Sequence, residues 1–119
     1  MNERDKFQSE LELTLIKNIK SFATSSELVY SAKDYTSATV LYFKTLFCIF
    51  DLFILKERGL IPKDHSERFR ILEKDFHDFY TFLDKNFPIY QSSYSVNIDK
   101  EVCDKIKEYV ERLIKEQGI

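Results

Sequence analysis

The chain has 119 residues, a formal net charge of −2 and an aromatic content of 15%. This length allows one domain with a core of its own and is too short for two domains. The 18 basic and 20 acidic residues include no lysine-rich run, which argues against a broad electrostatic grip on nucleic acid but not against a small local site. Two glycines and two prolines are too few turn residues for a many-stranded β protein.

The cysteines and the N-terminal residues argue against a metal site and a membrane protein. Cys48 and Cys103 have no cysteine or histidine nearby at a metal-ligand spacing, and we expect both to be buried, unreactive thiols. We therefore expect no metal and no cofactor. The first ten residues lack the apolar core of a signal peptide, so we expect a cytoplasmic protein that does not enter a membrane.

Apolar residues at three- and four-residue steps predict a first helix from Glu3 to Ala23. The run Thr24-Ser25-Ser26 is expected to stop this helix. Residues 27–33 either add a short helical turn or continue directly into the next helix.

The most apolar stretch, from Tyr35 to Gly59, predicts one long helix with apolar residues on nearly every side. Its apolar part contains only two charges, Lys44 and Asp51, and is shorter than the roughly 20 uninterrupted residues that a bilayer span needs. We therefore expect the central rod of a helical bundle. Asp34 is the predicted N-cap, and Gly59 is predicted to end the helix in a left-handed conformation.

A third helix is predicted to start at Asp64, because Glu67 completes a capping-box pattern three residues later. Its apolar stripe continues to Phe87, with a bend allowed between residues 74 and 78. Pro88 is expected to kink or end the helix because proline has no backbone N–H to donate.

The last part of the chain predicts a loop over residues 89–98 and a final helix that Asp99 caps. Residues 1–119 are thus predicted to form a single all-α domain. The expected architecture is an up-and-down antiparallel four-helix bundle, with room for a short extra helix.

Several residues from Asp34 onward follow an order that resembles the HEPN domain family, and its stand-alone bacterial and archaeal branch in particular. The resemblance covers residues 34–114. The matching features are the aromatic pair Tyr42-Phe43, Asp51 two turns later, Gly59 at the helix end, Pro62-Lys63-Asp64-His65, the segment Tyr90 to Tyr94, and the closing helix from Ile98 to Leu113.

The resemblance implies a homodimeric bundle that binds or cleaves RNA or a nucleotide, often beside a nucleotidyltransferase partner in a toxin–antitoxin pair. Tyr90 stands where the family has an arginine and Ser93 where it has an aspartate, while Tyr94 is retained. We therefore expect a non-catalytic or degenerate binding module. The alternatives are an active metal-independent ribonuclease and a structural oligomerisation adaptor.

Three residues are candidates for catalysis: His65, Arg70 and His77. On one continuous helix Arg70 and His77 would share a face about 10 Å apart, although a solvated helix face explains the spacing as well and is favoured. His65, next to Arg68, fits a general acid or base or a phosphate contact, because the pKa of histidine lies near neutrality. A histidine bonded to the backbone at the helix entry is the favoured alternative.

The candidate binding residues are Lys44, Asp51, Arg68, Tyr90 and Tyr94. Asp51 lies within apolar sequence, so it belongs to an exposed or interfacial strip, to a pocket wall, or to a buried ion pair. The exposed or interfacial strip is the default, and the sharper hypothesis pairs Asp51 with Arg68 or with Lys44 of a second subunit. The two tyrosines fit base stacking, although packing within the bundle is favoured.

Four phenylalanines around the central helix exceed what three covering helices need, which supports the expectation of a homodimer. These are Phe43, Phe47, Phe50 and Phe53.

Overall fold

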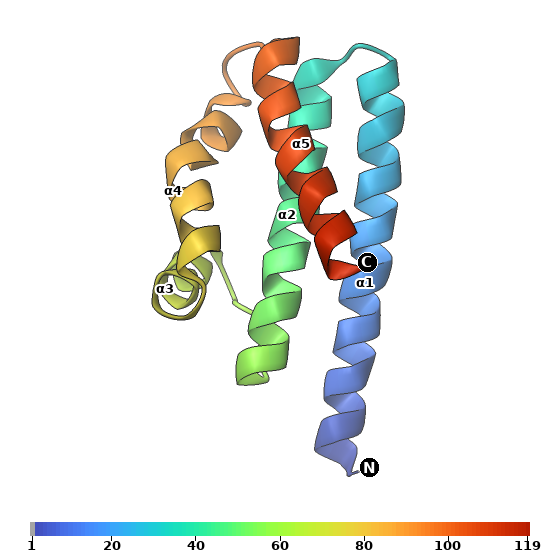
Figure 1. Cartoon of the computed structure of the whole chain (residues 1–119), viewed down its shortest axis with the longest axis vertical. Coiled ribbons are helices and arrows are strands. Elements are labelled where there is room, and N and C mark those ends of the chain that lie inside the picture. The colour runs from blue at the N-terminus through green and yellow to red at the C-terminus, as the bar shows by residue number, and fades with distance from the viewer. Residues whose placement is uncertain (1) are drawn as a thin grey trace.

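The computed structural model describes residues 2–119 and contains five α-helices (Figure 1). No strand occurs among the described residues, and the predicted all-α class is confirmed. The molecule is elongated, with extents of 47 × 27 × 25 Å. The helices are α1 (Glu3–Ser31), α2 (Tyr35–Arg58), α3 (His65–Asp75), α4 (His77–Ser92) and α5 (Lys100–Gln117).

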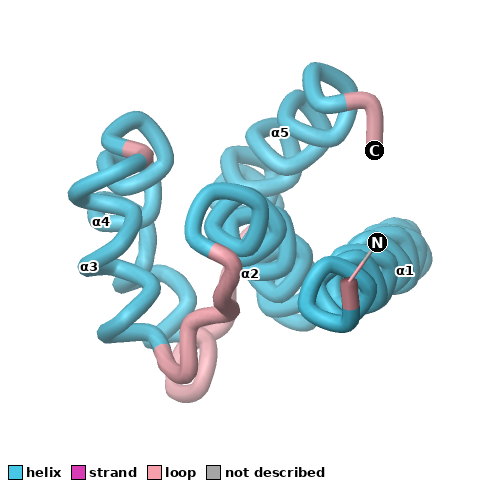
Figure 2. The backbone as a smooth tube through the Cα atoms, turned by 90° about the horizontal axis from the view of Figure 1, so that it is seen from below, coloured by secondary structure: helices cyan, strands magenta, loops and turns pink. Residues whose placement is uncertain are grey.

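The central position of α2 agrees with the prediction from its apolar sequence. α2 contacts each of the other four helices, and Figure 2 shows it between the α3–α4 pair on one side and α1 and α5 on the other. By length and composition alone α2 could cross a membrane, but 72% of its most apolar window is buried inside the molecule. Its apolar surface is therefore used by the core of this fold.

The helix ends follow the local chemistry of the sequence. Asp34 and Asp99 each accept a hydrogen bond from the backbone N–H three residues later, over 3.1 Å and 3.0 Å. Gly59 ends α2 with φ +74°, a left-handed conformation that glycine adopts without a Cβ clash. The Asp64 side chain accepts from Glu67 N, whereas the Glu67 carboxylate bonds to Lys63 N, so the predicted capping box forms with its second bond shifted by one residue.

The predicted stop of the first helix at Thr24-Ser25-Ser26 is wrong, because α1 continues to Ser31. The buried Ser26 hydroxyl donates to the carbonyl of Phe22 over 2.7 Å, so the side chain is satisfied inside the helix. The helix instead ends before Lys33, which adopts a positive φ of 64°. The phenol of Tyr30 then donates to Asp104 of α5 over 2.5 Å and ties the end of α1 to the last helix.

The segment expected as one helix from Asp64 to Phe87 is two helices, α3 and α4, which break at Phe76 within the range where a bend was allowed. Phe76 has φ −138° and ψ 65°, and its ring packs against Phe53 of α2 and Phe79. The break lets α3 lie across the long axis of the molecule while α4 runs along it (Figure 1). The chain therefore forms five helices in place of a plain four-helix bundle.

Pro88 does not end the fourth helix, which continues to Ser92, so the loop predicted over residues 89–98 is shorter than expected. Proline lacks the N–H that would bond to the carbonyl of Asp84, four residues earlier on α4, and Asp84 is a solvent-exposed residue. The turn after Pro88 is held by packing, because the Tyr90 ring contacts Phe43 and Phe47 at centroid distances of 5.4 Å and 5.2 Å.

The aromatic rings of α2 are covered within one chain. Phe43, Phe47 and Phe50 are buried and Phe53 is half-buried, and the last two pack against Phe79 of α4. These rings therefore lend no support to dimerisation, which stays a prediction from the family resemblance.

Gly59→Ala is expected to destabilise the protein by about 1–2 kcal/mol, because an L-residue with a Cβ is strained at φ +74°. The added Cβ would lie 3.4 Å from the Gln8 side chain, which is ordinary contact, so the strain comes from the backbone. Chemical denaturation measures the change. Gly118→Ala is the matched comparison, since Gly118 also has a positive φ, of 66°, at the end of α5, and it should lose stability for the same reason. A change below about 0.5 kcal/mol for Gly59→Ala would contradict the prediction.

Candidate functional site

The centre of the site is a buried ion pair between Asp51 of α2 and Arg68 of α3. Arg68 Nε donates to Asp51 Oδ1 over 2.8 Å, and Arg68 Nη2 donates to Oδ2 over 2.9 Å. The two side chains are only 9% and 10% exposed. The sharper hypothesis for Asp51 is therefore confirmed with Arg68 as the partner, and the exposed strip expected by default is wrong. Lys44, the other proposed partner, is exposed.

His65 continues this network toward the surface. The third nitrogen of the guanidinium, Arg68 Nη1, lies 2.7 Å from His65 Nδ1. A guanidinium only donates hydrogen bonds, so Nδ1 must accept and the ring proton must lie on Nε2. The favoured alternative, a histidine bonded to the backbone, is thus wrong, because the partner is the Arg68 side chain one turn further along α3.

Aromatic rings surround the inner face of His65. The ring centroids of Phe47, Phe87 and Tyr90 lie 4.8, 5.2 and 5.9 Å from that of the imidazole. Tyr94 lies next in the row, with its ring edge-on to Tyr90 at 6.2 Å and 80% of the residue exposed. We call His65, Phe47, Phe87, Tyr90 and Tyr94 the aromatic cluster. It joins a buried ion pair to an exposed aromatic side chain.

The electrostatic setting keeps His65 neutral. Although the residue as a whole is exposed, packing of its ring against the aromatic cluster lowers the pKa of His65, and the positive charge of Arg68 lowers it further. Asp51 and Asp64 oppose this shift, and Lys44 adds to it weakly. The neutral state agrees with the hydrogen bond from Arg68, because a protonated ring would place two N–H groups against each other.

The thiols near the site and in the core are protonated. Cys48, one turn before Asp51 and half-buried, has its pKa raised to about 11 by burial, and the nearby carboxylate of Asp51 adds to the shift. Burial also raises the pKa of Cys103. Both cysteines are free. Cys103 is buried as predicted, whereas Cys48 is only half-buried, and the raised pKa values of both thiols agree with the predicted lack of reactivity.

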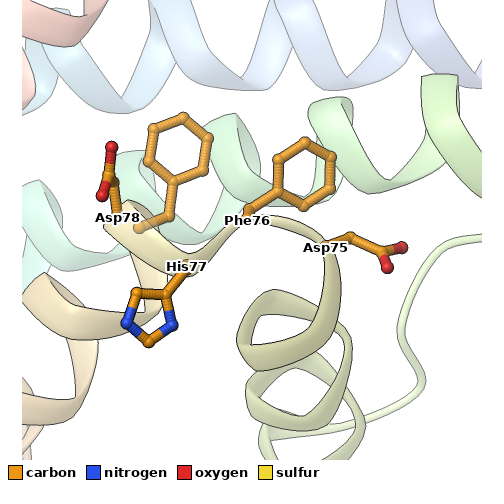
Figure 3. A pocket seen from close by; sticks show the side chains of 5 residues that line it. Asp75, Phe76, His77 and Asp78 are labelled. Atoms are coloured by element: carbon orange, nitrogen blue, oxygen red, sulfur yellow. The ribbon is translucent and has the colours of Figure 1, made fainter.

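The structure does not bring Arg70 and His77 together, because the helix that would have aligned them breaks at Phe76. Arg70 is exposed and lies 3.9 Å from the Glu67 carboxylate. Figure 3 shows Phe76 pointing toward α2 and His77 pointing the opposite way, beside an open cavity of about 320 Å³. Among residues 2–119 no hydrogen bond or ring contact joins His77 to Arg70, and His77 stacks on Tyr80 instead.

The sequence pointed to most of this site but missed two of its members. Lys44, Asp51, His65, Arg68, Tyr90 and Tyr94 were candidates, and all of them lie in or around the network. Phe47 was predicted only as one of the aromatic residues that support a homodimer and Phe87 only as part of an apolar stripe, yet Phe47 also stacks on the Arg68 guanidinium with 4.9 Å from Cζ to the ring centroid. The spacing of three residues between His65 and Arg68 on a helix was the available signal for their contact.

Comparisons with models of known protein families, with curated protein sequences and with solved structures found no match for this chain. Within residues 2–119 no group of three His, Cys, Asp or Glu side chains is placed to hold a metal ion. What the site offers is a neutral hydrogen-bonding histidine, an exposed aromatic ring and a nearby lysine.

Asp51→Asn is expected to destabilise the fold by about 3–5 kcal/mol, because it leaves the Arg68 charge buried without a counter-charge. Denaturation with urea measures the loss. The more exposed pair between Arg58 and Asp75 supplies the control, and Asp75→Asn should cost far less. A loss below about 0.5 kcal/mol for Asp51→Asn would show that the pair is not buried in solution.

His65 is expected to titrate below the ordinary histidine pKa of 6.5 in an NMR titration of its ring. The unfolded chain then binds more protons than the folded one as the pH falls through 6.5 toward the folded pKa. The contribution of His65 to stability is thus complete above 6.5 and lost below it. His65→Gln should remove this part of the pH dependence, and His77→Gln should retain it. A ring that titrates at or above 6.5 would contradict the assigned contacts.

Proposed function

We propose that this chain is a non-catalytic binding module that holds a base of RNA or of a nucleotide against the aromatic cluster. The observation that carries the proposal is Tyr94, a residue that is 80% exposed and whose ring stands at the end of a row of rings that leads through Tyr90 to His65. Large aromatic side chains are normally covered, and one that stays exposed beside a fixed polar group is a typical stacking platform for a base.

The charges around the aromatic cluster suit a small ligand with few phosphates. Lys44 is exposed on α2 and close enough to His65 to influence its pKa, so it supplies one cation for a phosphate. The net charge of −2 gives the chain no overall positive charge with which to attract phosphates. We therefore infer that affinity comes from stacking and from hydrogen bonds at the cluster, with only a small electrostatic part.

The same geometry argues against catalysis. The lone pair of His65 Nδ1 is taken by Arg68 and its other nitrogen carries the proton, so the ring has no free lone pair with which to act as a base. Arg68 is itself committed to Asp51. The second candidate is a metal-independent ribonuclease, and the experiment below separates the two.

The HEPN-like assignment belongs to this proposal and rests on the order of features along the chain. In its support, α2 carries Asp51 and ends at Gly59, Pro62 is buried just before His65, and α5 closes the domain. The resemblance also implies a homodimer and a nucleotidyltransferase partner. The proposed site needs neither of them, since every member of the aromatic cluster comes from one chain.

Tyr94→Ala is expected to weaken the binding of single-stranded RNA by roughly 5- to 150-fold, because one stacked base is lost. Tyr94→Phe keeps the ring and should bind like the unmodified protein. Val96→Ala is the control, because Val96 is also exposed in the same loop but offers no ring. Fluorescence anisotropy with a labelled RNA of mixed sequence measures the affinities.

The same RNA, incubated with the protein in the presence of a chelator, tests the second candidate. Intact RNA together with the loss of binding in Tyr94→Ala would support the binding module. Cleavage that disappears in His65→Ala or His77→Ala would replace the proposal with a ribonuclease. Equal affinity of Tyr94→Ala and the unmodified protein for RNA would exclude the aromatic cluster as the binding site.

A further inference from the structure

The contact between Arg68 and His65 exists only while the imidazole is neutral. Arg68 Nη1 lies 2.7 Å from His65 Nδ1, and a guanidinium has no atom that accepts a hydrogen bond. Protonation of Nδ1 would place two positively charged N–H groups against each other. Arg68 is buried and fixed by its two bonds to Asp51, whereas His65 is an exposed residue, so the histidine is the partner that moves.

The charges around His65 cancel at neutral pH. The charged side chains that act on its ring come from α2 and from the start of α3, and they are Lys44, Asp51, Asp64 and Arg68. Two of them are cations and two are acids. From α4 the phenol of Tyr90 faces the ring, and burial raises the pKa of this phenol, so it stays uncharged in acid. Uptake of one proton by His65 therefore leaves the surroundings with an excess positive charge.

We propose that, in acid, the protonated His65 ring separates from Arg68 and that the two cations then bind an oxyanion of the sulfate or phosphate type between them. Two cationic donors that repel each other directly are both satisfied by one oxygen-rich anion, because each of them donates to it. The nearby acids do not replace this anion. Both oxygens of Asp51 already accept from Arg68, and Asp64 accepts from the backbone N–H that it caps.

Lys44 strengthens the attraction of the protonated site for an anion. It is exposed on α2 and close enough to His65 to influence its pKa. Because the anion binds the protonated state more tightly, a bound anion raises the pKa of His65 by the same factor, as linkage requires. One added charge beside a dianion corresponds to about threefold to tenfold tighter binding, and thus to a rise in pKa of about 0.5 to 1.

This anion site does not depend on the proposed function, because sulfate has no base that could stack on an aromatic ring. Sulfate is also the suitable probe, since it keeps two negative charges across the pH range in which histidine titrates. Any change in its binding over that range therefore reports the protein and not the anion.

The test is an NMR titration of both histidine rings of the full chain with pH, in sodium sulfate and in sodium chloride of equal ionic strength. We expect sulfate to raise the pKa of His65 by about 0.5 to 1 and that of His77, which stacks on Tyr80 at an exposed position, by much less. Lys44→Gln should reduce the effect of sulfate on His65. Lys56→Gln, also at an exposed position of α2, is the matched control and should retain it.

The separation of the ring has its own readout in the same spectra. Nuclear Overhauser contacts from His65 to the rings of Phe47 and Phe87 should be present at neutral pH and disappear as His65 takes up its proton. Contacts that persist in the protonated protein, or equal effects of sulfate on both histidines, would overturn the inference. Unfolding of the chain before His65 is protonated, followed by circular dichroism in the same buffers, would overturn it as well.

A uridine dinucleotide identifies the source of the anion, because its single phosphodiester also keeps its charge over this pH range. A raised pKa of His65 with both the dinucleotide and sulfate assigns the site to phosphates of nucleic acid as well as to free oxyanions. An effect of sulfate alone restricts the site to free oxyanions, and no effect of either overturns the inference. The binding of RNA through Tyr94 is measured separately at neutral pH, so the proposed function and the anion site fail independently.

Discussion

The ion pair between Asp51 and Arg68 is the constraint on which the rest of the structure depends. Asp51 is the only acid within the apolar part of α2, and a buried carboxylate without a partner costs several kcal/mol. Its partner has to come from another helix, and Arg68 of α3 supplies it with two parallel hydrogen bonds. The position of α3 across the bundle, and with it the position of His65, follows from this pairing.

A buried ion pair of this kind is better explained by the way it orients nearby side chains than by a contribution to the stability of the fold. Apolar side chains of similar size often stabilise a core as well as a buried ion pair does, because they cost no desolvation. The pair between Arg58 and Asp75 already joins α3 to α2 two helical turns further along both helices, where the side chains are more exposed. What Asp51 and Arg68 add is a rigid guanidinium whose remaining nitrogen is aimed at His65. We interpret the pair as the support of the histidine.

The sequence predicted the parts of this fold that depend on local chemistry. Caps such as Asp34 and the left-handed Gly59 need only neighbouring backbone groups, so residue type and position were enough. The continuation of helices through Ser26 and Pro88 depends on satisfied hydroxyls and on the packing of rings from other helices, which one sequence does not reveal. The helix break at Phe76 likewise depends on packing between helices, since the Phe76 ring contacts Phe53 of α2.

In the candidate site, too, the sequence predicted what local chemistry decides and not the contacts that depend on packing between helices. The acid in an apolar helix marked Asp51 as a residue in need of a partner, but choosing between Arg68 and Lys44 requires knowing which helix faces α2. The pairing of Arg70 with His77 failed because it assumed one straight helix over both residues. His65 and Arg68 stand three residues apart on α3, so their contact was open to prediction from spacing, while the covering rings of Phe47 and Phe87 come from two other helices.

Burial decreases from Asp51 and Arg68 through His65 to Tyr94, and the buried and exposed residues have different roles. Asp51 and Arg68 are buried and cancel each other's charge, His65 lies at the surface without charge, and Tyr94 is open to solvent. A site built in this way offers a ligand direction and a flat apolar surface, but little net charge. In the RNA or nucleotide binding that we propose, the phosphate groups, which dominate most nucleic-acid binding, would contribute least, in keeping with a chain whose acids slightly outnumber its bases. Under the function we propose, recognition at this surface depends on the base.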